Sequence, residues 1–426
     1  MRTGPSVLDD LRWRGLLHQL TDERSLSARL DAGPLVAYCG FDPSANSLHV
    51  GNLQQLVLLR RLADAGHRPI ALIGGGTGMI GDPSGKSEER NLLDASQLDA
   101  NRAAVAGQVS VFFEERHDAI VADNAEWLEP AGLLGFLRDV GKSFRVNEMV
   151  RKDSVRSRLE GHEQGLSFTE FSYMLLQAWD FLHLHDRYGC VLQIGGSDQW
   201  GNITEGVDLI RRHRGRQAYG ITSPLITKAD GAKFGKTESG TVWLAPERTS
   251  PYEFFQFWLR APDADVGGYL RRLTLVERPR IEELDAATAA HPQRREAQRA
   301  LARELTAMVH GATEAAQAER TAAVLFTEEV AGLDGETLAG ALADAPTTAV
   351  ARGELEGGLA MVEALVRTGL AGSRRDARQL LAQGSVHLNG RRVGEDRPVE
   401  VADALHGRFV VLRRGRSTQH VLRVEP

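Results

Sequence analysis

Cysteine is scarce in this sequence: only Cys39 and Cys190 occur in 426 residues, far apart along the chain. Two isolated cysteines exclude a disulfide scaffold and a cysteine-based zinc site, so we expect a reducing, cytoplasmic setting. Long hydrophobic runs are also missing, and the first ten residues, M-R-T-G-P-S-V-L-D-D, lack the apolar core of a signal peptide. The sequence therefore predicts neither a membrane-spanning helix nor a secretory signal.

Lysine is absent from the last 68 residues, which contain 12 arginines and 7 acidic residues and so carry a net charge of +5. The whole chain carries −6, which leaves −11 for the remainder. An acidic body excludes a protein that binds nucleic acid over its whole surface, whereas a basic C-terminal segment favours an RNA-binding module. The length predicts two or three globular domains.

A strand–helix–strand pattern opens the ordered part of the chain. Residues 35–41, L-V-A-Y-C-G-F, form the short apolar run of a buried strand, and Ser47 is a candidate helix cap. Apolar residues then recur at helical spacing up to Gly66, and residues 69–73 predict a second buried strand. Such a βαβ unit places the first turn at the carboxyl edge of a parallel sheet, where ligands bind.

His49 and Asn52, in the motif H-V-G-N, are predicted on the first turn of that helix. The free backbone N–H groups of a helix start attract anions, phosphates above all. The alternative is a helix start with an ordinary polar cap, and four letters alone leave both interpretations open.

The glycine-rich segment after the second strand fits G-x-G-x-x-G at Gly76, Gly78 and Gly81. Its context does not fit a dinucleotide site, because Pro83 stands where the helix should run and no strand ends in an acidic residue about 20 positions later. We therefore expect a glycine loop whose backbone approaches a ligand closely, without nicotinamide chemistry.

Residues 167–184 predict a helix that begins with a capping box from Ser167 and Glu170. Tyr173, Gln177 and Asp180 lie at positions i, i+4 and i+7, on one narrow face amid apolar residues. Such polar groups need partners if they are buried. A solvent-exposed face is the alternative, although exposed faces usually carry Lys and Glu. The following H-L-H-D at 183–186 suggests a metal site, but no third ligand pattern supports it, and we interpret it as the polar end of the helix.

Another strand is predicted at 189–194, and it runs into G-G-S-D-Q-W-G-N. Two glycines and an acid at the end of a strand form a second ligand-facing turn, where Asp198 caps the next helix or binds ribose hydroxyls. Residues 231–240, G-A-K-F-G-K-T-E-S-G, form a basic glycine-containing loop suited to closing over polyphosphate, although the Walker A spacing is absent.

The remaining segments are predicted mainly as helices. Residues 94–138 are expected to be helical without recognisable chemistry, and 250–329 form further helices. The tail predicts a helix at 373–383 and a hairpin turning at Asn389–Gly390. Its arginines form a candidate RNA-phosphate surface, with a solvated basic face as the alternative: Arg374, Arg375, Arg378, Arg391 and Arg392.

Four motifs follow in order: H-V-G-N, the Y-x-x-x-Q-x-x-D helix, G-G-S-D-Q-W-G-N and K-F-G-K-T. In this combination the chain resembles the bacterial tyrosyl-tRNA synthetases, a class I aminoacyl-tRNA synthetase family, over nearly its whole length. Its last 68 residues are similar to the RNA-binding fold of small ribosomal subunit protein S-four. Two positions depart from the family pattern: Asn52 replaces the last histidine of HIGH, and Phe234-Gly235 replace the Met-Ser of KMSKS.

The resemblance implies a role for each matching residue. Six residues would hold tyrosine. Its phenol would bind Tyr38 and Asp180, and its α-amino group would bind Asp82, Tyr173 and Gln177. Gln199 would lie near its carboxylate. ATP would be lined by Gly40, Asp42, Gly51, Gly196 and Asp198, together with His49 and Lys236. The triphosphate would be gripped by the catalytic set His49, Asn52, Lys86, Arg90, Lys233, Lys236 and Thr237, and tRNA by the five tail arginines.

The resemblance also implies an α/β fold: a Rossmann-like catalytic domain at 1–245, a helical domain at 246–330, a linker at 331–357 and an α+β RNA-binding domain at 358–426. Tyrosine and ATP, with Mg²⁺, would form tyrosyl-adenylate and pyrophosphate, and the tyrosyl group would pass to the 3′ end of tRNA. This chemistry requires alignment and positive charge, not an enzyme nucleophile.

A homodimer without a structural metal is the expected state of such an enzyme. Two alternatives stay open: a tryptophanyl-tRNA synthetase of the same fold, and a non-catalytic RNA-binding protein. A Tyr and an Asp suited to a phenol disfavour the first alternative, and the intact lysine loop disfavours the second.

Overall fold

Two units make up the chain, one from residues 1–248 and 264–286, the other from 249–263 and 287–426. The computed structural model describes residues 6–84, 94–114, 118–152, 155–156, 159, 165–227, 236–237, 240–325, 328–342, 345–394, 397–415 and 418–425. Among these residues, no helix is long and apolar enough to cross a membrane.

The first unit is built on a six-stranded sheet with the order β1-β6-β5-β2-β3-β4. Neighbouring strands are parallel except at β1, which runs antiparallel to β6. The strands are β1 Gln19–Leu20, β2 Val36–Phe41, β3 Arg68–Ile73, β4 Ile120–Asp123, β5 Cys190–Gly196 and β6 Tyr219–Ser223; a separate hairpin pairs β7 Lys236–Thr237 with β8 Gly240–Thr241. The strand order reverses between β2 and β5, and the carboxyl ends there form the usual ligand crevice of such sheets.

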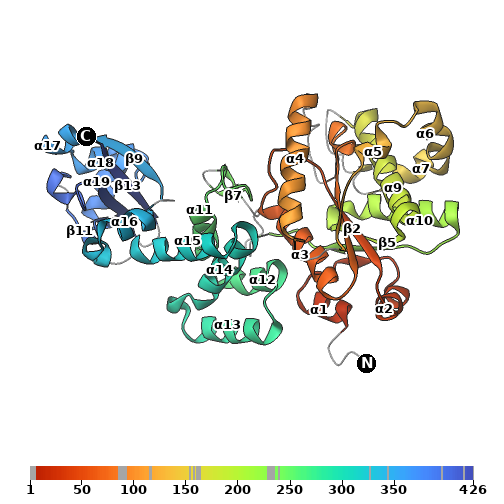
Figure 1. Cartoon of the computed structure of the whole chain (residues 1–426), viewed down its shortest axis with the longest axis horizontal. Coiled ribbons are helices and arrows are strands. Elements are labelled where there is room, and N and C mark those ends of the chain that lie inside the picture. Colours follow the sequence, from red (N-terminus) through yellow and green to blue (C-terminus); the bar gives the residue numbers. More distant parts are fainter. Residues whose placement is uncertain are drawn as a thin grey trace. The chain divides into compact units, whose positions relative to one another are not determined.

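Helices cover both faces of this sheet. Figure 1 shows α3 and α4 on one side of β2 and α9 and α10 on the other. The helices of this unit are α1 Val7–Trp13, α2 Glu23–Asp31, α3 Val50–Asp64, α4 Ala95–Val111, α5 Ala125–Leu128, α6 Leu133–Asp139, α7 Val146–Met149, α9 Phe168–Tyr188 and α10 Trp200–Arg214, with the short helices η1 Thr77–Met79, η2 Gly141–Ser143 and η3 Ser197–Gln199.

Two arginines hold residues 264–286 on the first unit. This segment contains most of α12 Asp263–Leu273 and of α13 Arg278–Ala290. Buried Arg14 donates to the backbone oxygens of Arg271 and Val276, and Arg61 donates to that of Thr274. Cations at the carbonyl end of a helix are favourable, which explains why two guanidinium groups meet after α12.

The second unit contains a helical bundle and a second sheet. Helices α11 Pro251–Leu259, α14 Glu296–His310 and α15 Ala312–Leu325 pack against one another. Ser250 caps α11 and Pro251 occupies its first position, as the sequence predicted. The fully buried Phe254 and Trp258 supply the centre of this bundle, with the ring of Phe254 5.0 Å from that of His310.

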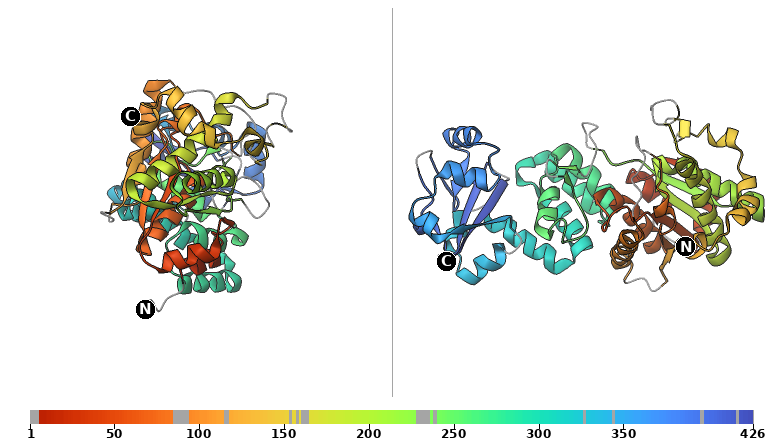
Figure 2. Two further views of the ribbon diagram at one scale, coloured as in Figure 1. Left: turned by 90° about the vertical axis from the view of Figure 1, so that its right-hand side faces the viewer. Right: turned by 90° about the horizontal axis from the view of Figure 1, so that it is seen from above.

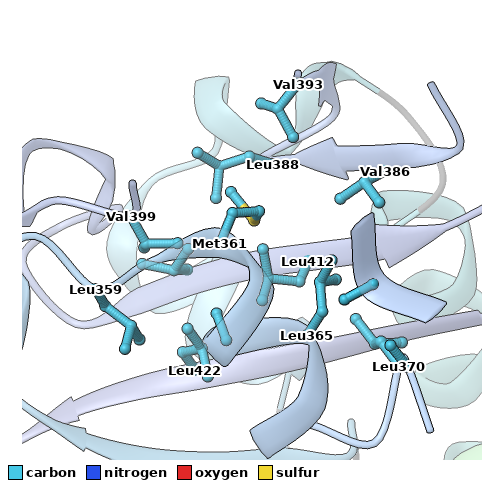
Figure 3. Packing of buried hydrophobic residues seen from close by; sticks show 14 of the residues in the cluster. Leu359, Met361, Leu365, Leu370, Val386, Leu388, Val393, Val399, Leu412 and Leu422 are labelled. Atoms are coloured by element: carbon cyan, nitrogen blue, oxygen red, sulfur yellow. The ribbon is translucent and has the colours of Figure 1, made fainter. Parts of the chain in front are cut away.

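The second sheet has the order β11-β10-β12-β13-β9 and belongs to the C-terminal part (Figure 2, blue). Its strands are β9 Thr347–Ala351, β10 Val386–Leu388, β11 Arg391–Arg392, β12 Phe409–Arg414 and β13 Thr418–Glu425. The remaining helices of this unit are α16 Gly335–Leu342, α17 Arg352–Glu356, α18 Met361–Arg367 and α19 Arg374–Ala382, with short helices η4 Pro292–Arg294, η5 Glu328–Gly332 and η6 Val401–Asp403. Met361 and Leu365 of α18 pack on Leu388, Leu412 and Leu422 of the sheet (Figure 3).

One buried hydrogen bond links the bundle to this sheet. The amide of Gln419 on β13 donates to the hydroxyl of Tyr252 on α11, and both side chains are buried. Burial raises the pKa of Tyr252 to about 12, so the phenol stays neutral and can accept this bond. The bundle and the sheet are therefore held together within one unit.

The predicted fold class is confirmed: a Rossmann-like parallel sheet, a helical segment and a C-terminal α+β fold. Two local predictions are wrong. Residues 120–123, expected within a helical stretch, form edge strand β4, because β3 offers it a parallel partner. Residues 335–342 and 347–356, expected inside a linker, form α16, β9 and α17, and Val350 is buried in the core of the second sheet. The domain boundaries themselves stay a prediction.

Candidate active site

A cavity of about 310 Å³ lies at the carboxyl ends of β2 and β5. All predicted tyrosine and adenosine residues whose side chains are described line it, together with the start of α3. They are Tyr38, Gly40, Asp42, His49, Gly51, Asn52, Asp82, Tyr173, Gln177, Asp180, Gly196, Asp198 and Gln199. Lys86, Arg90 and Lys233 lie outside the described residues, and only the backbone of Lys236 and Thr237 is described, within β7.

Asp180 and Tyr38 are deeply buried in the cavity wall, at 2% and 1% exposure. The carboxylate of Asp180 accepts from Asn124 Nδ2 at 2.9 Å and from Trp127 Nε1 at 2.8 Å. The hydroxyl of Tyr38 is buried and has no hydrogen-bond partner among the described residues. Buried polar atoms without partners are rare, so this hydroxyl is ready to bind a polar group of a ligand.

Burial controls the protonation of these two groups. It raises the pKa of Asp180 to about 8, against the opposing effect of the hydrogen bonds from Asn124 and Trp127. Burial, reinforced by the nearby charge of Asp180, raises the pKa of Tyr38 well above its usual value. The alternative of a solvent-exposed Tyr173–Gln177–Asp180 face is therefore wrong, since the neighbouring β4–α5 segment covers Asp180.

A chain of hydrogen bonds runs from Asp180 along one wall of the cavity. Asn124 Nδ2 also donates to Thr77 Oγ1 at 3.0 Å, and Thr77 donates to Asp42 Oδ1 at 2.8 Å. The hydroxyl of Tyr173 donates to the other oxygen of Asp42 at 2.8 Å. Neither Asn124 nor Thr77 was among the site residues predicted from the sequence. The signal for Asn124 was the short apolar run at 120–122, with Asn124 just beyond its end.

Amide side chains connect the remaining polar residues. Gln199 Nε2 donates to Asp82 Oδ2 at 2.6 Å, and Asn202 Nδ2 donates to the amide oxygens of Gln177 at 2.9 Å and Gln199 at 3.2 Å. Asn202 was also missed, although it ends the G-G-S-D-Q-W-G-N motif. These contacts bring α9, α10 and the η1 region together around one end of the cavity.

Gly196 brings the backbone of β5 close to the side chain of Asp198. A Cβ atom added at Gly196 would lie 2.4 Å from Asp198 Oδ1. The small residue thus lets this carboxylate fold against the strand end, where it lines the cavity.

Helix α3 begins at Val50, and its cap is His49 instead of the predicted Ser47. The Nδ1 atom of His49 accepts from the backbone N–H of Gly51 at 3.0 Å, and Asn52 Oδ1 accepts from the backbone N–H of His49 at 3.1 Å. Nδ1 is an acceptor here, so a neutral His49 carries its proton on Nε2 as a donor. Ser47 does not cap the helix, because its hydroxyl binds the backbone oxygen of Leu48.

The residues just after the β7–β8 hairpin are attached to the start of α3. Trp243 forms a β-bridge with His49, and Val50 N donates to the oxygen of Val242 at 3.1 Å. The rings of His49 and Trp243 contact edge to face, with centroids 6.1 Å apart. The segment just after the K-F-G-K-T motif therefore shares backbone contacts with the H-V-G-N motif.

The histidine–aspartate segment 183–186 does not form a metal site with other described residues. In the parts of the chain that the structure covers, no group of three His, Cys, Asp or Glu side chains could hold a metal ion. His185 Nδ1 bonds to the backbone oxygen of Cys190 at 2.8 Å, and Asp186 pairs with Arg214 at 2.7 Å.

The tail arginines lie on the exposed surface of α19 and β11. Arg374 pairs with Glu363 at 2.9 Å, and Arg392 donates to the backbone oxygen of Gln383. Arg375, Arg378 and Arg391 make no ion pair within the described part of the tail. These three cations are therefore available to an anionic partner.

Comparison with known proteins places the chain among translation enzymes. Residues 30–327 match the family described as tRNA synthetases class I (W and Y), and residues 337–422 match the Tyrosine--tRNA ligase SYY-like C-terminal domain. The tyrosine--tRNA ligase of Roseiflexus castenholzii is 51% identical over 424 residues, 98% of this chain and 99% of the relative. That of Bacillus caldotenax is 47% identical over 422 residues, 98% of this chain and 99% of the relative.

Solved structures give the same picture of the fold. A C-terminally truncated mitochondrial tyrosyl-tRNA synthetase from Aspergillus nidulans is 31% identical, with a TM-score of 0.68 over 76% of this chain and 95% of that one. A tryptophanyl-tRNA synthetase from Encephalitozoon cuniculi is 14% identical, with a TM-score of 0.53 over 72% of this chain and 86% of that one. The second likeness concerns the fold alone.

Proposed function

The chain belongs to the tyrosine–tRNA ligase family of class I tRNA synthetases, and we propose that the cavity at β2 and β5 holds the tyrosine and ATP of that reaction. The enzyme activates L-tyrosine with ATP and transfers the tyrosyl group to tRNA; the tryptophan alternative is not favoured. A carboxylate oxygen of tyrosine attacks the α-phosphorus, and pyrophosphate leaves. The terminal ribose hydroxyl of tRNA then displaces AMP from the acyl carbon.

The observation that supports this proposal is the buried pair Tyr38 and Asp180. A phenol placed between them would donate to the carboxylate of Asp180 and accept from the unpartnered hydroxyl of Tyr38. Pyrophosphate exchange tests the assignment. We expect exchange with tyrosine and little with tryptophan or phenylalanine, and exchange with none of the three would refute the proposed site.

The polar wall suits the charged end of tyrosine. Asp82 and the oxygen atoms of Tyr173 and Gln177 are acceptors for the α-ammonium group, and the amide of Gln199 lies beside Asp82 as a donor for the carboxylate. Gly40, Asp42, Gly196 and Asp198 would line adenosine. No side chain has to act as a nucleophile, because the substrate carboxylate is one already.

The start of α3 would receive the triphosphate. Gly51 and His49 line the cavity at the positive end of a helix. Lys86, Arg90, Lys233, Lys236 and Thr237 are assigned to the same phosphates from their motifs. ATP would enter as its magnesium complex, with the metal carried by the substrate.

Asn52 should replace the missing signature histidine through its amide. Its oxygen caps α3, which leaves the NH₂ group as a donor for phosphate. We expect Asn52→Ala to lower kcat/KM for ATP about tenfold or more, the usual effect of losing a bond to a charged group. Asn52→His should stay within a few fold of the parent in pyrophosphate exchange. Equal losses in both variants would mean that the amide serves only the helix cap.

We propose a homodimer that forms through an apolar surface on α6, α7 and the start of α9. Five large apolar side chains there are between 46% and 81% exposed: Leu133, Leu134, Leu137, Val146 and Phe168. Exposed apolar groups on neighbouring elements are typical of a protein interface. The parts of this surface on α7 and α9 are adjacent, because buried Met149 and Met174 pack these two helices against each other. We place the enzyme in the cytoplasm, where translation occurs.

Charge placed on this surface should separate the subunits. We expect Leu134→Asp and Phe168→Asp to shift the sedimentation of the chain from dimer to monomer, because each would bury an unpaired carboxylate at the interface. Val111→Asp, at a partly exposed apolar residue on α4, is the matched control and should leave the dimer intact. Unchanged sedimentation of both test variants would rule out this surface.

A further inference from the structure

His183, in the segment H-L-H-D near the end of α9, contacts Trp127, which in turn donates a hydrogen bond to Asp180 of the cavity wall. The imidazole of His183 stacks on the indole of Trp127, with ring centroids 4.2 Å apart and planes only 12° from parallel. His183 Nε2 is buried and has no hydrogen-bond partner within the described residues. The ring face, and not this nitrogen atom, therefore makes the contact.

The same indole donates to Asp180 at 2.8 Å through Nε1. Trp127 lies on α5, a helix of four residues whose N-cap residue, Asn124, makes no side-chain cap hydrogen bond. So short a helix has little stability of its own, and its position depends on contacts with neighbouring elements.

One face of α9 supplies such contacts. Asp180, His183 and Arg187 stand at positions i, i+3 and i+7 of α9, and each contacts a residue of α5. Asp180 accepts from the indole N–H, His183 covers the indole ring, and Arg187 pairs with Glu126 at 3.3 Å. Asp180 and His183 both contact Trp127, so together they fix the plane of its indole and the direction of its N–H.

We propose that His183 is a positioning residue for tyrosine recognition: its ring holds the Trp127 N–H on the carboxylate that meets the substrate phenol. This inference rests on the proposed assignment of Asp180 to the phenol. A hydrogen bond weakens steeply when its angle bends, so a tilted indole would leave Asp180 without one of its two donors. The carboxylate would then be held less firmly, and tyrosine would bind less well.

The test compares two replacements at His183 in the full chain. We expect His183→Leu, which keeps bulk and removes the aromatic stack, to raise the KM for tyrosine about 2- to 10-fold, the usual effect of losing an aromatic pair. The kcat and the KM for ATP should stay unchanged. His183→Phe restores a ring and should return the KM for tyrosine close to that of the parent. Arg187→Gln is the control: it breaks the ion pair to Glu126 and the contact with the Tyr188 ring, and because exposed ion pairs contribute little it should behave like the parent.

Two outcomes overturn the inference: a parental KM for tyrosine in His183→Leu, or equal impairment in His183→Phe. If the leucine variant does not fold, His183→Gln serves in its place under the same criteria. Asp180→Asn in the same assay separates this inference from the proposed function. No change in Asp180→Asn refutes the phenol site itself, whereas an effect there with none in His183→Leu refutes only the role of His183.

Discussion

Asp180→Asn is expected to remove most of the preference for tyrosine over phenylalanine. The parent carboxylate accepts from Asn124 and Trp127 and has room to accept from the phenol. An asparagine at this position has one oxygen, and its NH₂ group would face a donor, either Asn124 or Trp127. That buried donor would then have no acceptor. Losing a hydrogen bond to a charged acceptor costs about 1.5–3 kcal/mol, which corresponds to roughly a 10- to 150-fold loss in kcat/KM for tyrosine.

Tyr38→Phe should have a smaller effect than the change at Asp180. It removes one neutral hydrogen bond, worth roughly 0.5–1.5 kcal/mol. Pyrophosphate exchange with tyrosine and with phenylalanine measures both variants. Asp186→Asn, the same substitution at a half-exposed residue of α9, is the matched control. An unaltered ratio of tyrosine to phenylalanine exchange in Asp180→Asn and Tyr38→Phe would mean that the phenol binds elsewhere.

The pH dependence of tyrosine binding gives an independent measurement of the same group. Burial raises the pKa of Asp180 to about 8, so the protonated acid prevails in the empty cavity below that pH. The ionised form is the stronger acceptor for a phenol. The ratio of tyrosine affinity in the parent to that in Asp180→Asn should therefore rise as the pH increases through about 8. The phenol stays neutral up to about pH 10, and loss of the α-ammonium proton weakens binding in both proteins alike, so the ratio reports on Asp180.

A chain that ends at Gly332 should form tyrosyl-adenylate and lose nearly all charging of tRNA. Every described residue of the cavity lies in the first unit, whereas the exposed arginines of α19 and β11 lie beyond the cut. A cut near Glu356 would be less suitable, because it would leave β9 without its partner β13. A C-terminally truncated relative from Aspergillus nidulans has a solved structure, so that relative folds in truncated form.

The full-length chain allows a finer test of the same prediction. Alanine at Arg375, Arg378 and Arg391 should raise the KM for tRNA, leave pyrophosphate exchange unchanged and flatten the salt dependence of tRNA binding. Each lost phosphate contact should reduce the slope of log K against log salt by about 0.7–0.9. Arg374→Ala, whose guanidinium already pairs with Glu363, should have less effect. Parental charging by the Gly332 chain, or a parental salt slope in the triple variant, would contradict the proposed RNA surface.

Sequence periodicity predicts the fold well where the pattern is long. The apolar strand at 36–41, the helix that ends before Gly66 and the capped helix from Phe168 all have their expected places. It fails where an element depends on a distant partner. Strand β4 is only four residues long and forms because β3 pairs with it. Strand β9 likewise forms because it pairs with β13. Neither partner can be inferred from local pattern.

Motifs predict which residues gather at the cavity, but not how they are held there. His49 and Asn52 are marked by their motif, yet the reciprocal bonds that cap α3 depend on backbone geometry. Asn124 and Trp127 belong to no motif, and only the path of the chain after β4 brings them to Asp180. Residues that orient a binding group are hidden in a single sequence, because nothing local distinguishes them from ordinary core or turn residues.

The hydrogen bond between Gln419 and Tyr252 has a consequence for engineering of the C-terminal part. The C-terminal sheet looks like a separate module that could be exchanged between related enzymes. One of its hydrogen bonds, however, is to the phenol of Tyr252 on α11, which lies 167 residues before Gln419 in the sequence. A foreign tail without a matching amide would cover that hydroxyl and leave it without a partner, at a cost of about 1–3 kcal/mol. A chimera should therefore take α11 and the sheet from the same parent.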